Sequence, residues 1–272
     1  MSDRPTAFIT GASAGLGAEF ARQLAAQGYD LILTARRQER LAALAPELEA
    51  SRGITAETLP ADLSRESDLE RAEARLAACP TLALLINNAG FGTTGYFAGV
   101  AREKSVAMLR VHLEATVRLT HAALPGLLAQ TAGGLINVAS VAAFNPVPGG
   151  AVYSGTKAFL VNFSQSLAAE LRGTGVRVQA LCPGFTETEF HDTEEYHAFS
   201  RRQIPRFMWI TAEAVVRESL AGLRRGPVVC VPSTRYKLAV AVMRYFSFAP
   251  AAMRFIRRRA GRLKEPGPNE YR

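Results

Sequence analysis

Short apolar runs alternate with longer amphipathic segments along most of this chain. The runs cover residues 6–10, 31–34, 82–86, 135–138, 176–181 and 228–231. Each is apolar throughout or nearly so, without a polar residue at every second position, which is typical of parallel strands buried on both faces. The intervening segments have helical length and periodicity. The pattern predicts an α/β protein with a single doubly wound parallel sheet, helices on both faces and a helical C-terminal extension.

A glycine-rich turn follows the first run. Glycines recur in the spacing Gly-x-x-x-Gly-x-Gly, and a helical segment at 18–24 and the second run come next. Strand, glycine turn, helix and strand within about thirty residues are the context of a dinucleotide site in a Rossmann-like fold. A tight turn that needs glycine only for positive φ is the alternative. We predict that the turn binds the cofactor pyrophosphate through Gly11, Ser13, Ala14, Gly15, Leu16 and Gly17.

Tyr153 and Lys157 are four residues apart, and Ser140 lies thirteen residues upstream of the tyrosine. On a helix, positions i and i+4 share a face. A cation beside a phenol favours the phenolate and lowers the tyrosine pKa, so Tyr153 could exchange a proton with a carbonyl oxygen. Ser140 could hold the same oxygen by a hydrogen bond. Tyr-x-x-x-Lys alone is common on exposed helices, so the prediction depends on the upstream glycine turn.

Together these motifs resemble the short-chain dehydrogenase/reductase family. Thr10–Gly17 is similar to its cofactor segment, and Ser140, Tyr153 and Lys157 match its catalytic residues. Three further segments match in the family's order: Asp62-Leu63, Asn87-Asn88-Ala89-Gly90 and Cys182-Pro183-Gly184-Phe185-Thr186. The resemblance implies further cofactor contacts from Asp62, Leu63, Asn88, Ala89, Gly90, Pro183, Gly184, Thr186 and Thr188, and from Tyr153 and Lys157 at the nicotinamide ribose.

The residues after the second run predict the cofactor. An NAD enzyme usually places an acid there for the ribose hydroxyls, whereas a basic residue accommodates a 2′-phosphate. This chain has Arg36 and Arg37 and no acid at the strand end. We therefore predict NADP(H) rather than NAD(H), with Arg36 as the first phosphate contact and Arg37 as the second. Ala14 stands where some family members carry another basic residue.

His112 departs from the family pattern. Many members carry an Asn at this position, and the resemblance implies that this Asn holds a water in a proton relay through the catalytic lysine. An imidazole can hold a water and carry a proton near neutral pH. We predict that His112 either takes the place of the Asn in catalysis or is a packed histidine in a helix with a local kink.

The predicted activity is interconversion of a carbonyl and a secondary alcohol, with hydride from NADPH and the proton from Tyr153. The resemblance implies that segment 186–210 folds over the substrate, and its aromatic residues fit either an apolar ketone, fatty acyl or steroid-like substrate or a lid packed on the core. A dinucleotide-binding sensor or scaffold without turnover is one alternative. A membrane-surface 3-oxoacyl thioester reductase is another. The intact serine, tyrosine and lysine favour an enzyme.

The 272 residues suit one catalytic and cofactor-binding domain, 1–234, followed by an extension, 235–272. Three widely spaced cysteines provide neither a disulfide framework nor a metal site, and the first run begins too early for a signal peptide. We therefore predict a cytoplasmic protein without a metal. The resemblance implies a homodimer or homotetramer.

The extension carries the whole formal charge of the chain. Residues 235–272 hold ten Lys/Arg and two Asp/Glu, whereas residues 1–234 hold 22 of each sign. Three interpretations stay open: a helix packed on the body or a neighbouring subunit, a basic amphipathic segment on an anionic membrane surface, or a mouth that attracts an anionic substrate. Because the basic run lacks a recognisable binding module, we do not predict nucleic-acid binding.

Overall fold

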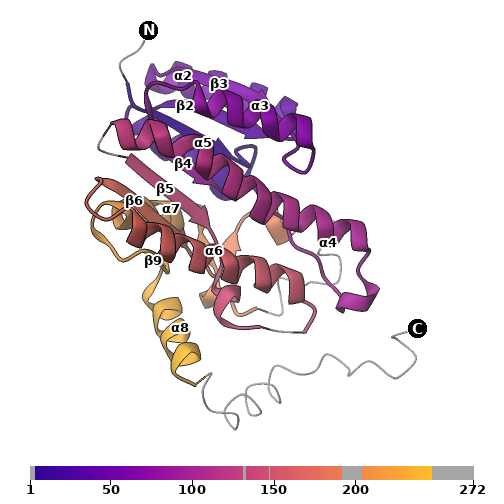
Figure 1. The fold of residues 1–272 in the computed structure, drawn as a ribbon. Coiled ribbons are helices and arrows are strands. Elements are labelled where there is room, and N and C mark those ends of the chain that lie inside the picture. The colour runs from indigo at the N-terminus through magenta and orange to yellow at the C-terminus, as the bar shows by residue number, and fades with distance from the viewer. Residues whose placement is uncertain (1–3, 131–132, 147, 192–203, 247–272) are drawn as a thin grey trace.

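A single parallel sheet organises the protein. The computed structural model describes residues 4–130, 133–146, 148–191 and 204–246. Seven strands lie in the order β3-β2-β1-β4-β5-β6-β9, and every paired neighbour is parallel (Figure 1). Their bounds are β1 Thr6–Thr10, β2 Asp30–Ala35, β3 Ala56–Pro60, β4 Leu82–Asn87, β5 Gly133–Val138, β6 Val176–Leu181 and β9 Val229–Cys230. The predicted doubly wound α/β fold is therefore confirmed.

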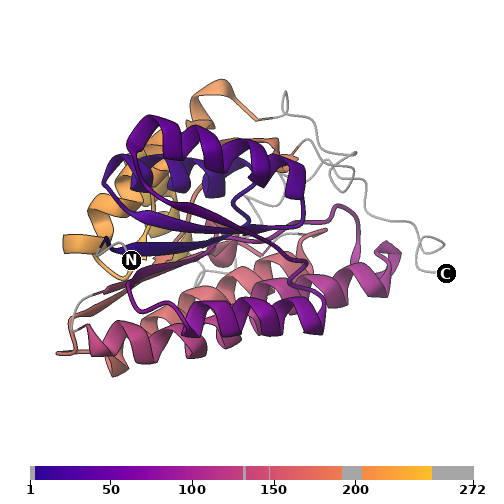
Figure 2. The ribbon, with the colours of Figure 1, turned by 90° about the horizontal axis from the view of Figure 1, so that it is seen from above.

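Helices cover both faces of the sheet, as Figure 2 shows. On one face α1 packs against α2 and α7, and on the other α3 packs against α5, beside α6. The bounds are α1 Gly15–Ala26, α2 Gln38–Arg52, α3 Glu66–Ala77, α4 Arg102–Leu109, α5 Ala115–Ala129, α6 Ala151–Glu170, α7 Ala212–Arg225 and α8 Thr234–Phe246. Short 3₁₀ turns are η1 Phe97–Gly99, η3 Val141–Phe144, η4 Glu189–His191 and η7 Arg206–Met208, and η2 Arg110–Glu114 is a π-helical turn between α4 and α5.

The central strands are buried because both of their faces carry apolar side chains. All residues of β1 and β2 are buried, and Phe8, Ile9 and Leu33 expose 1% or less of their surface. β3 is different: only its first residue is fully buried, since it lies at the sheet edge. The apolar runs therefore predict the central strands well and miss the edge strand.

The strand order reverses between β1 and β4. In a doubly wound sheet, the crevice at the carboxyl ends of the strands beside such a reversal is the place where ligands bind. β1 and β4 pair through Ile9 and Ile86, so the residues after these strands lie next to each other. The glycine turn and the Asn88–Gly90 segment meet at this crevice.

The first helix of the C-terminal extension is anchored to the domain. Tyr236 and Val240 of α8 are buried, with 3% and 5% of their surface exposed, whereas Leu238 and Val242 are exposed (Figure 1). The Tyr236 hydroxyl donates to the Met208 carbonyl at 2.8 Å and accepts from the Phe185 N–H at 3.0 Å. One face of α8 therefore belongs to the core of the domain; residues 247–272 of the predicted extension lie outside the described part.

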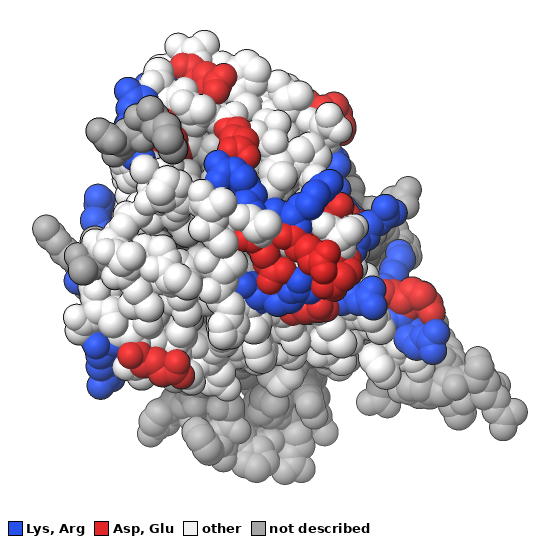
Figure 3. Space-filling view, turned by 45° about the horizontal axis from the view of Figure 1, so that its top comes forward, with Lys and Arg blue, Asp and Glu red and all other residues white. Residues whose placement is uncertain are grey.

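Acidic and basic side chains are interleaved on the face shown in Figure 3, beside a broad area that has neither. Among the described residues, Arg118 pairs with Glu66, Glu73 and Glu114. The described side chains on the face in Figure 3 do not form one basic surface. Of the helices in the described ranges, none has the length and apolar content needed to cross a membrane.

Candidate active site

The glycine turn is shaped by close backbone contacts. Gly11 and Gly15 have φ of 67° and 53°, in the left-handed region that favours glycine. A Cβ on Gly17 would overlap the Gly11 carbonyl, so α1 starts close against the end of β1. Because these positions exclude side chains, the turn leaves its backbone open to a ligand, which is the property that a pyrophosphate site requires.

The start of α1 is open to an anion. Ala14 is the N-cap residue, and it supplies no side-chain acceptor to the first turn. The first turn also has no acidic residue. Because the N–H groups that begin a helix have no partner within the helix, this terminus favours a negatively charged group. Leu16, the second residue of α1, packs against the core and fixes the helix on the sheet.

A threonine links the glycine turn to the segment after β4. Thr10 Oγ1 accepts from the N–H groups of Asn88 and Ala89, both at 2.9 Å. Asn88 Nδ2 donates to the carbonyls of Thr10 at 2.9 Å and Gly11 at 3.2 Å. Asn88 and Ala89 therefore lie beside the turn, as the resemblance implies, and Thr10 is a positioning residue that pattern analysis did not single out.

Of the two predicted phosphate ligands, Arg37 lies closer to the glycine turn. Its Nε and Nη2 atoms donate to Ser13 Oγ at 3.2 and 3.0 Å. Arg36 is exposed and lies near Asp62, whose pKa its charge helps to lower. The geometry thus gives Arg37 a place beside the turn and Arg36 a place beside the predicted adenine region.

The Asp62–Leu63 pair is held by its neighbours. Burial acts to raise the Asp62 pKa, but hydrogen bonds from the Ser64 hydroxyl and N–H outweigh it and hold the pKa below its ordinary value. Leu63 is buried, with 6% of its surface exposed. The carboxylate therefore caps its own loop at the carboxyl end of β3.

Ser140, Tyr153 and Lys157 come together at the carboxyl end of β5. Ser140 lies two residues after the end of β5 and caps η3, and Tyr153 and Lys157 lie on one face of α6. Lys157 Nζ lies 5.6 Å from the centre of the Tyr153 ring and donates to the Val138 carbonyl at 2.8 Å. The predicted grouping of these three side chains is thus present in the fold.

Burial controls the protonation of this group. It raises the pKa of Tyr153 to about 12, although a hydrogen bond with Ser140 acts to lower it. It also lowers the pKa of Lys157 to about 8. The prediction that Lys157 lowers the tyrosine pKa is not matched by the structure, because desolvation of the phenolate is the larger effect.

His112 lies in the π-helical turn, buried with 1% of its surface exposed. Its Nε2 accepts from the Phe91 N–H at 3.1 Å, so Nδ1 carries the proton and donates to Thr156 Oγ1 at 2.8 Å. Burial and the nearby charge of Lys157 hold its pKa well below the ordinary value. Since both ring nitrogens are bonded to protein groups, the geometry favours the packed histidine at a helix kink over a water-holding proton carrier.

Gly90 and Gly184 are needed for close packing. A Cβ on Gly90 would lie 2.9 Å from His112 Nε2, and one on Gly184 would overlap the Tyr236 ring. The Pro183 carbonyl accepts from the Val141 N–H at 3.1 Å, which joins this loop to η3. The loop from Pro183 thus lies between the catalytic group and α8.

The segment after Gly184 returns toward the glycine turn. Thr186 is buried and bonds to the Gly184 carbonyl at 3.0 Å. Thr186 and Glu187 form β7, which pairs with β8 Ile210–Thr211. Thr188 is the residue nearest to the position of a Cβ on Gly15, at 3.2 Å. The predicted cofactor segments that follow β1, β4 and β6 therefore lie next to one another at the carboxyl edge of the sheet.

Residues 5–197 match the family described as short chain dehydrogenase. The match spans more than half of the sequence. The chain belongs to the short-chain dehydrogenase/reductase family.

Relatives of this short-chain dehydrogenase/reductase act on different substrates. The chain is 42% identical over 191 residues to a serine 3-dehydrogenase from Agrobacterium fabrum, covering 68% of this chain and 73% of that protein. A short-chain dehydrogenase from Sphingobium yanoikuyae in complex with NADPH is 32% identical, with a TM-score of 0.80 over 97% of this chain and 99% of that chain. A bulky-bulky ketone specific alcohol dehydrogenase from Comamonas testosteroni is 27% identical, with a TM-score of 0.76 over 99% of each chain.

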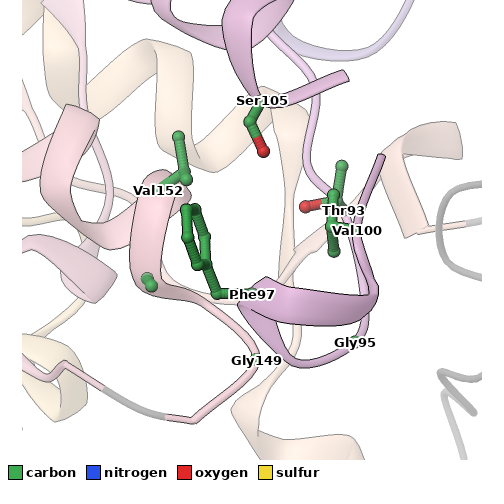
Figure 4. Close-up of a pocket in the computed structure, with 8 residues that line it drawn as sticks. Thr93, Gly95, Phe97, Val100, Ser105, Gly149 and Val152 are labelled. Atoms are coloured by element: carbon green, nitrogen blue, oxygen red, sulfur yellow. The ribbon is translucent and has the colours of Figure 1, made fainter. Parts of the chain in front are cut away.

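A small pocket lies beside the first turn of α6 in this short-chain dehydrogenase/reductase (Figure 4). The loop after β4, α4 and the first turn of α6 line it with Thr93, Gly95, Phe97, Val100, Ser105, Gly149, Ala151 and Val152. Phe97 points toward Val152, the residue before Tyr153 (Figure 4). Phe97, Val100, Ala151 and Val152 give the wall apolar side chains, and Thr93 and Ser105 give it two hydroxyl groups.

Besides Thr10, three functional candidates lie outside the predicted set. Tyr236 packs on the Pro183 loop, and Arg40 and Glu189 form an ion pair near the glycine turn. The apolar stretch that contains Tyr236 indicates only a helix, and Glu189 is one of several acids in segment 186–210. Neither position has a motif that distinguishes it. Among the described residues, no cluster of three His, Cys, Asp or Glu could hold a metal.

Proposed function

We propose that the protein is an NADP(H)-dependent oxidoreductase that interconverts a carbonyl and a secondary alcohol. The observation that carries the proposal is the grouping of Tyr153, Ser140 and the buried Lys157 at the same edge of the sheet as the glycine turn. When bound, the cofactor supplies or accepts the hydride. The protein supplies the cofactor site, a place for the carbonyl and a proton.

The glycine turn and the open start of α1 fit a pyrophosphate, and Arg37 fits a 2′-phosphate. Asp62, Leu63 and the Asn88–Gly90 segment would border the adenosine half, and the Pro183–Thr188 segment would border the nicotinamide. The NADPH complex of the Sphingobium relative and the absence of an acid at 36 and 37 both support NADP(H).

In the reductive direction, Tyr153 donates its hydroxyl proton to the carbonyl oxygen. Its pKa of about 12 means that it holds this proton throughout the physiological range. Ser140 would donate a hydrogen bond to the same oxygen. The Lys157 ammonium donates to the Val138 carbonyl and lies over the tyrosine ring. Because its pKa is about 8, Lys157 can return a proton to Tyr153. Tyr153, Ser140 and Lys157 would thus supply the proton, the hydrogen bond to the oxygen and the replacement proton.

We infer an apolar ketone as substrate class. The supporting observations are the apolar side chains of Phe97, Val100 and Val152 at the pocket beside α6 and the ketone named for the Comamonas relative. The serine 3-dehydrogenase relative favours a small polar alcohol instead. A panel of bulky ketones, aldehydes, steroids, acyl thioesters and serine, read by NADPH consumption, distinguishes these classes.

The Tyr153→Phe variant makes the panel a test of mechanism. We expect loss of turnover with NADPH binding retained, and normal turnover for Tyr29→Phe, which removes a partly buried hydroxyl away from the site. Turnover in Tyr153→Phe, or no turnover of any carbonyl by the wild type, would overturn the proposal.

We also infer a homo-oligomer and a contact with membrane surfaces. Val106 and Leu109 of α4 and Phe159 of α6 are exposed by 38–43% on helices that touch each other, which supports a protein interface. Leu238 and Val242 are exposed four residues apart on α8, next to the basic extension, which supports an anionic lipid surface.

A further inference from the structure

Glu189 binds two arginines at the mouth of the cofactor crevice. Its Oε1 lies 2.5 Å from Arg37 Nη2, and its Oε2 lies 2.6 Å from Arg40 Nη1. Arg37 donates to Ser13 Oγ at the same time. The carboxylate therefore completes a chain of polar contacts that runs from the glycine turn, across the end of β2, to the segment after β7.

The position of Glu189 coincides with the expected position of a 2′-phosphate. The 2′-phosphate of NADP(H) is expected just beyond the end of β2, where Arg37 is the N-cap residue of α2. Thr188, the preceding residue, already lies against Gly15 of the turn. A carboxylate with one oxygen on each of two guanidinium groups presents to them the same kind of anionic oxygens as a phosphate.

We propose that Glu189 is a specificity-determining residue that occupies the 2′-phosphate position on Arg37 and Arg40 and that the 2′-phosphate displaces it. The inference rests on the proposed NADP(H)-dependent function. It adds Arg40 to the cofactor site and assigns Glu189 the role of a competing anion.

The electrostatics favour displacement. The three side chains are 36–47% exposed, so solvent screens the ion pairs and can take up the released carboxylate. A phosphate monoester carries about −1.5 to −2 at neutral pH, whereas the carboxylate carries one charge. The ribose 2′-hydroxyl of NAD(H) has no charge and cannot compete. Only NADP(H) should therefore open the pair.

The pair persists over a wide pH range. Burial acts to raise the Glu189 pKa, but hydrogen bonds from Arg40 and Arg37 outweigh it and hold the pKa below its ordinary value. Competition between the carboxylate and the phosphate is therefore expected throughout the neutral range.

Direct binding of NADPH and NADH to the full-length protein tests the proposal. We expect Glu189→Gln to lower the Kd for NADPH at least threefold, because the competing anion is gone, and to leave the Kd for NADH within twofold. Arg40→Gln should raise the Kd for NADPH at least threefold, again with NADH unchanged. A merely structural role would move both cofactors together.

Glu213→Gln is the matched control, because Glu213 also forms a surface ion pair with an arginine, Arg217, at 2.8 Å. It should change neither Kd by more than twofold. An unchanged or higher Kd for NADPH in Glu189→Gln, or equal shifts for both cofactors, overturns the inference and leaves the proposed function intact. Wild-type protein that binds neither cofactor, or NADH alone, overturns the proposed function and the inference with it.

Discussion

His112 Nδ1 lies 2.8 Å from Thr156 Oγ1 and joins the π-helical turn to the catalytic helix. The Thr156 hydroxyl donates in turn to the Tyr153 carbonyl at 2.8 Å. Because Nε2 of the same ring accepts from Phe91, the imidazole connects the loop after β4 to the backbone of Tyr153. We therefore expect His112 to be a positioning residue that acts on Tyr153 through its main chain.

His112→Ala should reduce kcat by about tenfold, because small displacements of a catalytic group are costly. It should also lower the free energy of unfolding by about 2–3 kcal/mol, since buried polar partners lose their hydrogen bonds. A positioning role predicts the same fractional loss of kcat from pH 6 to 9. A loss that grows or fades with pH would instead support the proton-carrier interpretation. Thr156→Val, which removes the next link, serves as the matched comparison.

The depressed pKa of Lys157 predicts a stability profile. The folded pKa is about 8 and the unfolded value about 10.5, so between these values the unfolded chain binds more protons. Stability should therefore rise with pH across this window, by up to about 1.4 kcal/mol per pH unit. Denaturant unfolding of the wild type and Lys157→Met at pH 7.5, 8.5 and 9.5 measures the difference. Parallel curves for the two proteins would contradict the depressed pKa.

Gly184→Ala should destabilise the protein by about 1–3 kcal/mol, because the new methyl group meets the Tyr236 ring. Thermal or urea unfolding measures the change. Gly126→Ala is the matched control: its Cβ would meet no atom within 4 Å, and alanine in α5 should add up to about 1 kcal/mol of stability. In a Tyr236→Ala background the cost of Gly184→Ala should shrink, and additive effects would refute the contact.

The full-length protein should sediment with vesicles that contain anionic lipid and not with neutral vesicles. Ten basic residues after position 234 and exposed Leu238 and Val242 supply the charge and the apolar contact. Leu238→Glu should reduce the bound fraction severalfold, and Phe207→Glu, at an equally exposed aromatic residue, should not. Equal sedimentation with both lipid compositions would argue against a membrane contact.

The sequence predicts the fold and the meeting of the motifs because both depend on local patterns. Continuous apolar runs identify the inner strands, and the order of the motifs places Asn88 and Gly184 at the same sheet edge as the glycine turn. The edge strand β3 is missed because its residues, Ala-Glu-Thr-Leu-Pro, have one face partly exposed and no continuous apolar run.

Other features depend on tertiary contacts that no local pattern records. The packing of Tyr236 on Gly184 and the ion pair of Glu189 with Arg37 join segments more than fifty residues apart. The direction of the Tyr153 pKa shift is a property of burial, which the four-residue spacing to Lys157 does not reveal. For His112, the sequence leaves open a proton carrier or a packed histidine at a helix kink. Only the hydrogen bonds of both ring nitrogens favour the packed histidine.

The start of α1 has neither a capping side chain nor an acid in its first turn. The N–H groups at this end of the helix have no partner in the helix, so an anion that binds them should stabilise the folded protein. The melting temperature therefore becomes an assay in its own right. Pyrophosphate, ADP and 2′,5′-ADP, ranked by how far each raises it, would map the nucleotide half of the site before any substrate is known.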